Sequence, residues 1–470
     1  MRKTKIICTI GPACDNKDTL IKMCLAGMNV ARLNFSHGTH EDHIQKFNLI
    51  KEVREQLELP IAIMLDTKGP EYRIKTFKDN KIVLNDGDDF MFTAEELIGD
   101  STRVSVSYKN LPKELVPGDK ILLNNGLVSF EVVSVDGDNI YTKVLSGGEI
   151  SDRKSMSFPG KVLKQDFLSE QDKTDLIFGI EQGIDFVAAS FVSTEDDMRA
   201  MRTFIDEHGG KDVDIIAKIE NRAGVDNIDE ICKVADGIMV ARGDLGVEIP
   251  FVEVPSVQKY LIKKCRMLGK RVITATEMLE SMINNPRPTR AEISDVANAV
   301  YDGSSAIMLS GETAAGKYPV DAVKNMSEIA EFTERGIDYK QWFLSTEFKI
   351  RNNIDAVSHA TCAMAVDTDA KCIVVTSMSG QTARMVSRFR CPVDIIGMTI
   401  NERAWRKLNL SWGVTPVLSE EFNSVEVLLY HALVEAKRVK KLKKGDNVVL
   451  TGGRINGRPG NTNIIKLETV

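Results

Sequence analysis

The sequence reads IIAKIEN at residues 215–221 and GIMVARGDLG at residues 237–246, and these two stretches decide the fold class. Each begins with an apolar run of strand length, which is typical of a parallel strand that is buried on both faces. Lys218 and Glu220 end the first run, and Asp244 follows the second. Because buried charges are costly unless they pair or bind a ligand, the two stretches predict a polar site at neighbouring strand ends.

The same alternation of an apolar run and a helical segment recurs along the chain. The apolar runs and their polar ends lie at 5–10, 28–38, 60–71, 185–191, 213–220, 237–244, 271–278 and 306–313. Eight such units, in roughly 250 residues once one insertion is removed, predict a (β/α)8 TIM barrel. In a barrel of this kind the functional site lies at the carboxyl ends of the strands, where the polar residues of this chain fall.

The remaining segments predict two further domains, as expected for a chain of 470 residues. Between about 72 and 164 the pattern has a period of two residues and is broken by Asp-Gly, Asn-Gly and Gly-Gly turns, which indicates a small all-β module. Beyond 336 the pattern favours an open α/β domain. We therefore predict an α/β protein in which residues 1–70 and 169–340 form the barrel. Residues 71–168 form an inserted β-barrel lid, and residues 341–470 form a C-terminal α/β effector domain.

The net charge and the length of the apolar runs argue against nucleic acid and membranes as partners. The net charge of −6 gives no basic excess of the kind that binds nucleic acid. The longest apolar runs have the length of strands and are too short to span a membrane. The eight cysteines are scattered and form no CxxC pair, which favours free thiols and a cytoplasmic location.

Residues near the second and third strand ends predict a cation site. Arg32, Asn34 and Ser36 alternate, so we expect their side chains to face the same side, and Asp66 with Thr67 ends the next run. Oxygen ligands of this kind suit a hard monovalent cation such as K⁺. The alternative is ordinary turn capping, because Asn, Ser and Asp favour turns.

The opening stretches predict a second site, for a divalent cation. Glu220 and Asp244 supply two carboxylates with Lys218 beside them, which suits Mg²⁺ that holds a phosphorylated or enolate-forming substrate. The alternative for Lys218 and Glu220 is a structural ion pair within the barrel. Thr276 and Ser310 add hydroxyl groups at the last two strand ends, and for each the alternative is helix capping.

Six stretches together resemble the pyruvate kinase family, and the resemblance covers essentially the whole chain. They are MNVARLNFSHG (28–38), MLDTKGPE (64–71), IIAKIEN (215–221), GIMVARGDLGVEIP (237–250), TATEMLESMINNPRPTRAE (274–292) and DGSSAIMLSGETAAGKYP (302–319). The resemblance implies transfer of the phosphoryl group of phosphoenolpyruvate to ADP, which gives pyruvate and ATP in the last step of glycolysis. The alternatives are another Mg²⁺-enolate barrel enzyme, such as a pyruvate aldolase or lyase, and a non-catalytic binding protein.

The resemblance implies roles at the barrel mouth. Lys218 is expected to stabilise the transferring phosphoryl group, and Arg32 to bind the phosphate of the substrate. The Gly243 amide and the Thr276 hydroxyl are expected to hold the substrate carboxylate. Thr276 and Ser310 are also expected on the side from which the enolate is protonated, through water.

The resemblance also implies ligand sets for the cations and the nucleotide. These are Glu220 and Asp244 for Mg²⁺ or Mn²⁺, Asn34, Ser36, Asp66 and the Thr67 carbonyl for K⁺, and Arg73 and Lys154 for ADP. The divalent ion is expected to bind substrate oxygens as well. Glu71 resembles the K⁺-dependent members of the family.

Regulation and assembly are further expectations from the resemblance. Ser377, Ser379, Gly380 and Thr382 open a helix and are similar to the loop of the family that binds a phosphorylated effector. Residues 454–462 resemble the loop that closes over that effector, and the family resemblance implies a homotetramer. The alternative is a capped turn in an unregulated enzyme. The lid departs from the usual pattern, because Ser157 replaces a frequent Asn and KQDFL at 164–168 replaces the usual hinge.

Overall fold

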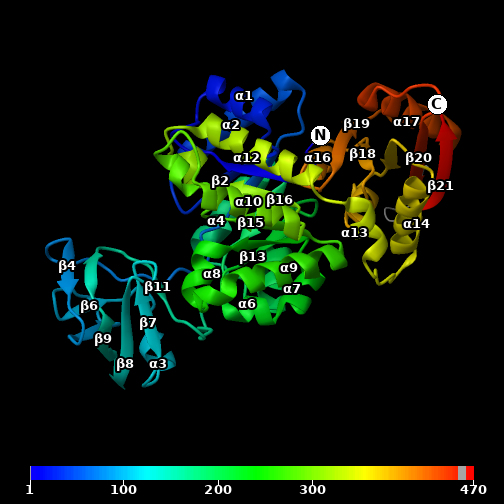
Figure 1. Cartoon of the computed structure of the whole chain (residues 1–470). Coiled ribbons are helices and arrows are strands. Elements are labelled where there is room, and N and C mark those ends of the chain that lie inside the picture. Colours follow the sequence, from blue (N-terminus) through cyan, green and yellow to red (C-terminus); the bar gives the residue numbers. More distant parts are fainter. Residues whose placement is uncertain (1, 454–461) are drawn as a thin grey trace.

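The computed structural model describes residues 2–453 and 462–470, and Figure 1 shows three units in it. A ring of strands and helices lies in the middle, and a strand-rich unit lies on one side of it. The unit that contains the C-terminus lies on the other side. Apart from Thr462, the predicted effector-closing loop falls outside the described residues.

Eight parallel strands close into a barrel in the order β1-β16-β15-β14-β13-β12-β3-β2. They are β1 (Lys5–Thr9), β2 (Val30–Asn34), β3 (Ala62–Asp66), β12 (Phe186–Ala189), β13 (Asp214–Ile219), β14 (Gly237–Ala241), β15 (Arg271–Ala275) and β16 (Ala306–Leu309). Ile7, Met64, Phe186 and Ile273 are among the apolar side chains that form the core inside the barrel. The predicted TIM barrel is therefore confirmed.

Helices surround the barrel, and local sequence determines where several of them begin. They are α1 (Lys17–Ala26), α2 (His40–Leu57), α4 (Glu170–Glu181), α5 (Glu195–Glu207), α6 (Arg222–Asp226), α7 (Ile228–Val234), α8 (Arg242–Glu248), α9 (Val254–Leu268), α10 (Arg290–Asp302), α11 (Gly311–Ala314) and α12 (Pro319–Arg335), with short 3-10 turns at Phe251–Glu253 and Glu280–Ile283. Thr39, Ser169, Thr194 and Thr289 each form a capping box at the start of a helix.

Two segments depart from a simple alternation of one strand and one helix. Residues 222–234 form two short helices, α6 and α7, which meet at Asn227, whose side chain donates a hydrogen bond to the Ser193 carbonyl at 2.9 Å. The glycine-containing segment after β14 forms the helix α8. Arg242 anchors the start of this helix, because Nη1 lies 2.7 Å from Asp295 Oδ1 and Nη2 donates to the Thr276 carbonyl at 2.6 Å.

The inserted segment is all β apart from one short helix. A six-stranded sheet has the order β11-β7-β8-β9-β5-β6, and a two-stranded sheet pairs β10 with β4. The elements are β4 (Lys81–Leu84), β5 (Asp89–Thr93), β6 (Arg103–Ser105), α3 (Leu111–Glu114), β7 (Lys120–Leu123), β8 (Val128–Asp136), β9 (Asn139–Ser146), β10 (Gly148–Ser151) and β11 (Met156–Ser157). Phe90, Phe92 and Phe130 pack against one another in its core. We call this unit the β module.

The C-terminal unit is an open sheet with helices on both faces. The strand order is β19-β18-β17-β20-β21, and β21 is antiparallel to β20. The elements are α13 (Tyr339–Ser345), α14 (Asn353–Asp367), β17 (Cys372–Thr376), α15 (Gln381–Ser387), β18 (Asp394–Thr399), α16 (Glu402–Leu408), β19 (Val414–Leu418), α17 (Val425–Lys440), β20 (Asn447–Gly453) and β21 (Thr462–Thr469). We call it the C-terminal domain, and it matches the predicted α/β fold.

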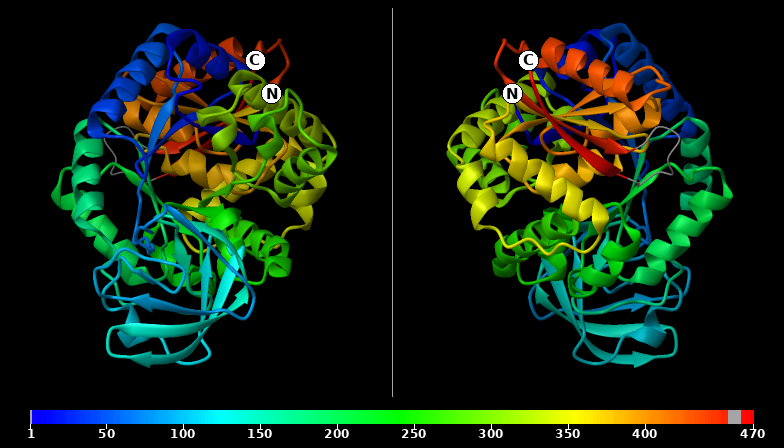
Figure 2. Two further views of the ribbon diagram at one scale, coloured as in Figure 1. Left: turned by 90° about the vertical axis from the view of Figure 1, so that its left-hand side faces the viewer. Right: turned by 90° about the vertical axis from the view of Figure 1, so that its right-hand side faces the viewer.

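The β module and the C-terminal domain contact opposite ends of the barrel (Figure 2). Arg406 and Lys407 of α16 pair with Asp185 at 2.9 Å and with Asp214 at 2.7 Å. Both carboxylates lie at the amino ends of barrel strands. The β module follows β3 and therefore leaves the barrel from a carboxyl end. Among the described helices, none has the length and apolar character needed to cross a membrane.

Candidate active site at the barrel mouth

The predicted site residues lie at the carboxyl ends of the barrel strands. Asn34 and Asp66 are the last residues of β2 and β3, and each is the register partner of the other. Lys218 lies near the end of β13, and Glu220 directly follows that strand. The barrel closure therefore gathers residues that are far apart in the sequence.

Asp66 joins the two cations of the site. Its Oδ2 atom lies 2.6 Å from Arg32 Nε, and its Oδ1 atom lies 3.0 Å from Lys218 Nζ. Asp66 is 1% exposed. Burial alone would raise the pKa of this carboxyl group, but Arg32 and Lys218 outweigh burial and hold the pKa below its usual value. Arg32 also donates to Thr9 Oγ1 at 2.8 Å, so its orientation is fixed.

Lys218 has carboxylates on two sides, and the ion pair with Glu220 that was the alternative to a site role is present. Nζ lies 3.0 Å from Glu220 Oε1 in addition to its contact with Asp66. Burial opposes the charge of Lys218, but the two carboxylates raise its pKa. Lys218 therefore remains a cation, and a structural ion pair and a phosphoryl site are not exclusive alternatives here.

Ser190 is a site residue that the sequence interpretation missed. It follows β12, and its hydroxyl group accepts from Lys218 Nζ at 2.7 Å and donates to the Thr67 carbonyl at 2.6 Å. Ser190 thereby links the lysine to the residues predicted for K⁺. Its signal in the sequence is its place at the end of the apolar run 185–191, a strand end to which no polar residue was assigned.

Glu220 is a buried carboxylate whose donor atoms suit a metal. Its Oε2 atom accepts from the Phe191 amide at 2.6 Å, and its buried Oε1 atom contacts only Lys218, at 3.0 Å and without hydrogen-bond geometry. Burial, with Asp244 adding to it, raises the pKa of Glu220 to about 7 despite the nearby Lys218. A buried carboxylate of this kind is stabilised by a nearby cation.

The donor set near Glu220 fits a divalent ion that also binds water and substrate oxygens. Asp244 is exposed, lies in the first turn of α8 and interacts electrostatically with Glu220 and Lys218. No group of three or more His, Cys, Asp or Glu side chains that could hold a metal occurs among the described residues. Two carboxylates with open positions for water and substrate oxygens are typical of Mg²⁺ sites at phosphate groups.

The predicted carboxylate-binding groups form one unit. The Gly243 amide donates to Thr276 Oγ1 at 2.8 Å, and Thr276 has a left-handed backbone conformation with φ of 68°. Ser310 lies at the end of β16, and its amide donates to Glu312 at 2.7 Å. The other oxygen of Glu312 accepts from the Leu279 amide at 3.0 Å, which connects the two hydroxyl-bearing loops.

The predicted K⁺ ligands come from the ends of β2 and β3, with one difference from expectation. Ser36 does not continue the strand alternation, because β2 ends at Asn34 and the Ser36 amide donates to Asn34 Oδ1 at 3.1 Å. The Thr67 carbonyl accepts one hydrogen bond from Ser190, which leaves it a second lone pair. One carboxylate with three neutral oxygen donors fits a monovalent cation.

Comparison with known proteins decides the family of this chain. Residues 1–323 match the family described as pyruvate kinase, barrel domain, and residues 355–468 match pyruvate kinase, alpha/beta domain. The chain belongs to the pyruvate kinase family. Its members are phosphotransferases, and the alternative of an aldolase or lyase is not favoured.

Individual relatives agree with this assignment. The chain is 44% identical to the pyruvate kinase of Clostridium acetobutylicum, with both sequences covered in full. It is 47% identical to the pyruvate kinase of Geobacillus stearothermophilus, of which it spans 80%. A crystal structure of a pyruvate kinase from Cryptosporidium parvum matches with a TM-score of 0.94 at 40% identity, and the match covers 100% of this chain and 96% of that one.

A cavity of about 180 Å³ separates the barrel mouth from the β module. Glu71 and Asp244 are among its lining residues. Arg73, predicted to meet the nucleotide, pairs with Glu71 and donates to the Arg153 carbonyl at 2.6 Å. Lys154 lies on the facing segment, because Arg73 pairs in register with its neighbour Ser155. The two predicted nucleotide ligands therefore lie at the base of the β module, and Arg73 contacts the cavity-lining Glu71.

Glu248 is a second residue that the sequence interpretation missed. It ends α8, one turn after Asp244, and its carboxyl group accepts hydrogen bonds from the Ser157 hydroxyl and the Phe158 amide of the β module. Burial, which these hydrogen bonds oppose, raises the pKa of Glu248 to about 7. Its only sequence signal is the spacing of four residues from Asp244, which places both on one face of a helix.

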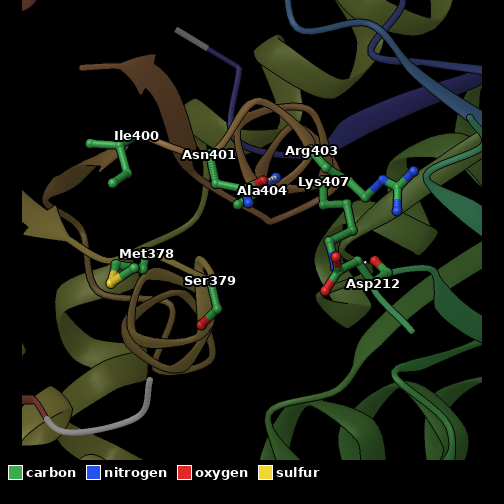
Figure 3. Close-up of a pocket in the computed structure, with 8 residues that line it drawn as sticks. All are labelled: Asp212, Met378, Ser379, Ile400, Asn401, Arg403, Ala404 and Lys407. Carbon is green, nitrogen blue, oxygen red and sulfur yellow. Dashed lines mark hydrogen bonds between the residues drawn. The ribbon is translucent and has the colours of Figure 1, made fainter. Parts of the chain in front are cut away.

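The predicted effector residues lie in the C-terminal domain, far from this site in the sequence and at the other end of the barrel. Ser379 is exposed and lines a cavity of about 360 Å³ together with Met378, Asn401 and Arg403 (Figure 3). Gly380 has a φ of 76°, which favours glycine. Ser377 and Thr382 do not line this cavity, and the Thr382 hydroxyl lies 2.5 Å from Thr462 Oγ1.

Proposed function

We propose that the barrel mouth transfers the phosphoryl group of phosphoenolpyruvate to ADP by means of Lys218, Glu220 and Asp244. The observation that supports these roles best is Lys218, whose side chain is 12% exposed and has carboxylates on two sides and a raised pKa. A fixed cation at the point where charge moves stabilises the transition state without reorganisation.

Arg32 and Lys218 bind the transferring group. Both are cations near the carboxyl ends of barrel strands, and ion pairs with Asp66 hold their side chains in place. A phosphoryl group adds charge-assisted hydrogen bonds to the cations without removing Asp66, since each cation has several donor hydrogens. This arrangement stabilises phosphoryl transfer mainly by position and charge.

Glu220 and Asp244 hold Mg²⁺ or Mn²⁺. The bound ion supplies a Lewis acid that stabilises negative charge on substrate oxygens. Glu220 contributes its buried Oε1 atom, which lies 3.0 Å from Lys218 Nζ, and Asp244 contributes an exposed carboxylate that faces incoming substrate. The Gly243 amide and Thr276 hydroxyl, already 2.8 Å apart, orient the substrate carboxylate beside these ligands.

Asn34, Ser36, Asp66 and the Thr67 carbonyl hold K⁺. The bound cation adds positive charge near the phosphate of the substrate. Asp66 belongs both to this set and to the Arg32 and Lys218 pairs, so it couples the cation site to the phosphoryl site.

Thr276 and Ser310 serve the last step, in which the enolate takes a proton. Their hydroxyl groups hold the water that delivers this proton. Glu312 supports both loops through the Ser310 and Leu279 amides, which keeps the two hydroxyl groups in a fixed relation. An active site to which the ends of several strands contribute residues is typical of TIM-barrel enzymes.

Arg73 and Lys154 bind ADP at the base of the β module. The module acts as a lid, and its closure excludes water that would otherwise hydrolyse the phosphoryl group. The contact of Glu248 with Ser157 and Phe158 supports this role, because it joins the helix of the metal ligand Asp244 to the lid.

The C-terminal domain binds a phosphorylated effector at the loop that contains Ser377, Ser379, Gly380 and Thr382. The exposed Ser379 and the cavity beside it support this assignment. The enzyme acts in the cytoplasm as a homotetramer. Large exposed apolar side chains at Phe251, Val252 and Phe332 support an assembly, since such residues often mark interfaces.

An assay of the purified protein tests the proposed function. ATP and pyruvate are measured with phosphoenolpyruvate, ADP, Mg²⁺ and K⁺ present, and then with each component left out. We expect equal amounts of the two products, and no product without the divalent ion. Glu220→Gln and Asp244→Asn should each weaken the response to Mg²⁺, and a full response in both variants would contradict the metal assignment.

A further inference from the structure

Six cationic side chains line a small void between the barrel and the C-terminal domain. They are Arg266, Lys270, Arg271, Arg384, Arg388 and Arg390. The void is remote from the barrel mouth. Arg266 lies in the last turn of α9, Lys270 follows that helix and Arg271 begins β15, while the other three cations belong to the C-terminal domain. The proposed function uses none of these residues.

Three of the six cations have carboxylate partners. Arg271 lies 2.6 Å from Asp214, and Arg388 lies 3.1 Å from Asp355. Arg384 lies 3.4 Å from Asp236. Each of these three carboxylates therefore offsets the charge of its own arginine and not that of Arg266 or Arg390.

Arg266 and Arg390 have no such partner, and Lys270 donates to the Ala235 carbonyl at 2.6 Å. Among the described residues, no carboxylate lies within 4.0 Å of either guanidinium group. Arg390 donates only to neutral groups, at 2.7 Å to the Ser387 carbonyl and at 3.1 Å to both the Gly303 carbonyl and Ser305 Oγ. Arg266 stacks on Trp342 at 4.3 Å. Two buried cations are thus left with neutral and aromatic neighbours.

The two arginines also repel each other. Arg266 is 6% exposed and Arg390 is 3% exposed. Burial and, to a smaller extent, the positive charge of Arg266 together lower the pKa of Arg390 to about 9. The carboxylate of Glu334 acts on Arg390 from a distance, but its oxygens already accept from the Lys3 and Thr4 amides at 2.7 and 2.6 Å.

Unused donors point to a ligand in the void. The Nε atoms of Arg266 and Arg390 are buried and have no hydrogen-bond partner, and neither has Ser411 Oγ. Ser411 is 1% exposed and lines the same void. Buried donors that remain without partners are rare in folded proteins, so each requires an explanation.

The size of the void limits the ligand. Its free volume is about 10 Å³, which is the room for about one water molecule. Phosphate, sulfate and sugar phosphates need several times this space. A single water would accept hydrogen bonds but would leave the positive charge uncompensated.

We propose that this void binds one monatomic anion of the halide class, which Arg266 and Arg390 hold together with Ser411. Arg266 comes from the barrel and Arg390 from the C-terminal domain, so the anion joins the two domains. Chloride is the abundant ion of this class. The anion offsets the repulsion between two arginines that would otherwise oppose docking of the domains.

Bromide, which scatters anomalously, tests the location of the site. Crystals of the full chain are grown in chloride-free buffer and soaked in sodium bromide. We expect an anomalous peak within hydrogen-bond distance of the Nε atoms of Arg266 and Arg390. A featureless void, or a water without an anomalous signal, would overturn the proposal.

Thermal unfolding tests the energetics in solution. Sodium gluconate is replaced by sodium chloride at constant ionic strength, and we expect the apparent Tm to rise by about 2 °C. Arg266→Met keeps an apolar stem against Trp342 but removes one charge. In gluconate this variant should be at least as stable as the original protein, and its Tm should not respond to chloride.

A matched control separates this site from general salt effects. Arg335→Met removes an arginine whose side chain is 72% exposed, and it should leave the chloride response unchanged. The same response to chloride in Arg266→Met as in the original protein would contradict the proposal. The proposal would also be contradicted if Arg266→Met lowered the Tm by the same amount in gluconate and in chloride. That result is expected if Arg266 has only a structural role.

Discussion

Lys218 Nζ lies 3.0 Å from Asp66 Oδ1, and this contact joins β13 to β3 across the intervening strand β12. Alternate strands of a TIM barrel contribute side chains to the same layer, so the pairing follows from the barrel geometry. Asp66 also holds Arg32, which makes this buried carboxylate the anchor for both cations of the proposed phosphoryl site.

Asp66→Asn should therefore damage stability as well as activity. The variant leaves Arg32 and Lys218 buried around a neutral amide, and loss of one partner from a buried ion pair typically costs about 3–5 kcal/mol. Denaturant unfolding measures this loss. Asp89→Asn is the control, because Asp89 pairs with Lys143 at the surface and its side chain is 88% exposed. We expect at most about 1 kcal/mol there, and equal losses in the two variants would contradict the anchoring role.

Glu248 should make closure of the β module sensitive to pH. Its pKa in the docked arrangement is about 7, above the ordinary value of 4.5. Docking therefore binds a proton, and the cost of burying the carboxylate grows as the pH rises from about 4.5 to about 7. We expect hydrogen exchange of the Phe158 amide, corrected for its intrinsic pH dependence, to accelerate between pH 5.5 and 7.5.

Glu248→Gln removes this titration and should abolish the pH dependence of the corrected exchange rate. Glu149→Gln is a matched control on the β module, because Glu149 is exposed and pairs with Lys81 at the surface. An unchanged pH profile in Glu248→Gln would show that another group controls the lid.

The enzyme should be activated by K⁺. Asn34 and Asp66 are register partners at the proposed cation site, and Glu71 stands nearby in the chain. Rates are compared in K⁺ and in tetramethylammonium, which is too large for the site. Asn34→Ala removes one neutral ligand and should raise the K⁺ concentration for half-activation severalfold. Equal rates in the two cations would refute the K⁺ assignment.

A phosphorylated sugar or nucleotide should lower the half-saturating concentration of phosphoenolpyruvate. Ser379→Asp places a negative charge in the effector loop, so it should repel the phosphate and weaken the response by tenfold or more. Ser419→Asp, on the neighbouring loop after β19, is a control for added charge. A response to the effector that Ser379→Asp leaves unchanged would argue against this loop.

Much of the fold was predictable because hydrophobic pattern and capping residues act locally. The eight strands and the helix that begins after Thr289 follow from sequence period and a capping box. The helix α8 was not predictable in this way, because its glycines weaken the helical signal and Arg242 holds its start through Asp295, 53 residues away.

The site was predictable in its residue types but not in its contacts. Residues such as Glu220 and Asp244 are visible as charges that end apolar runs. Ser190 is a small residue without charge, and its importance arises only when the barrel brings it within 2.7 Å of Lys218. Glu248 likewise has no role until the β module packs on α8. Tertiary contacts between distant segments cannot be read from local pattern.

The turnover of Lys218→Met, measured together with its affinity for phosphoenolpyruvate, tests the proposed role of Lys218 most directly. Methionine fills similar space but supplies no charge for the moving phosphoryl group. Removal of one such group typically costs about 10²–10³ in kcat, and we expect at least this loss with less than tenfold change in substrate affinity. Lys143→Met, at the surface, should turn over normally. Near-normal turnover of Lys218→Met would contradict the account.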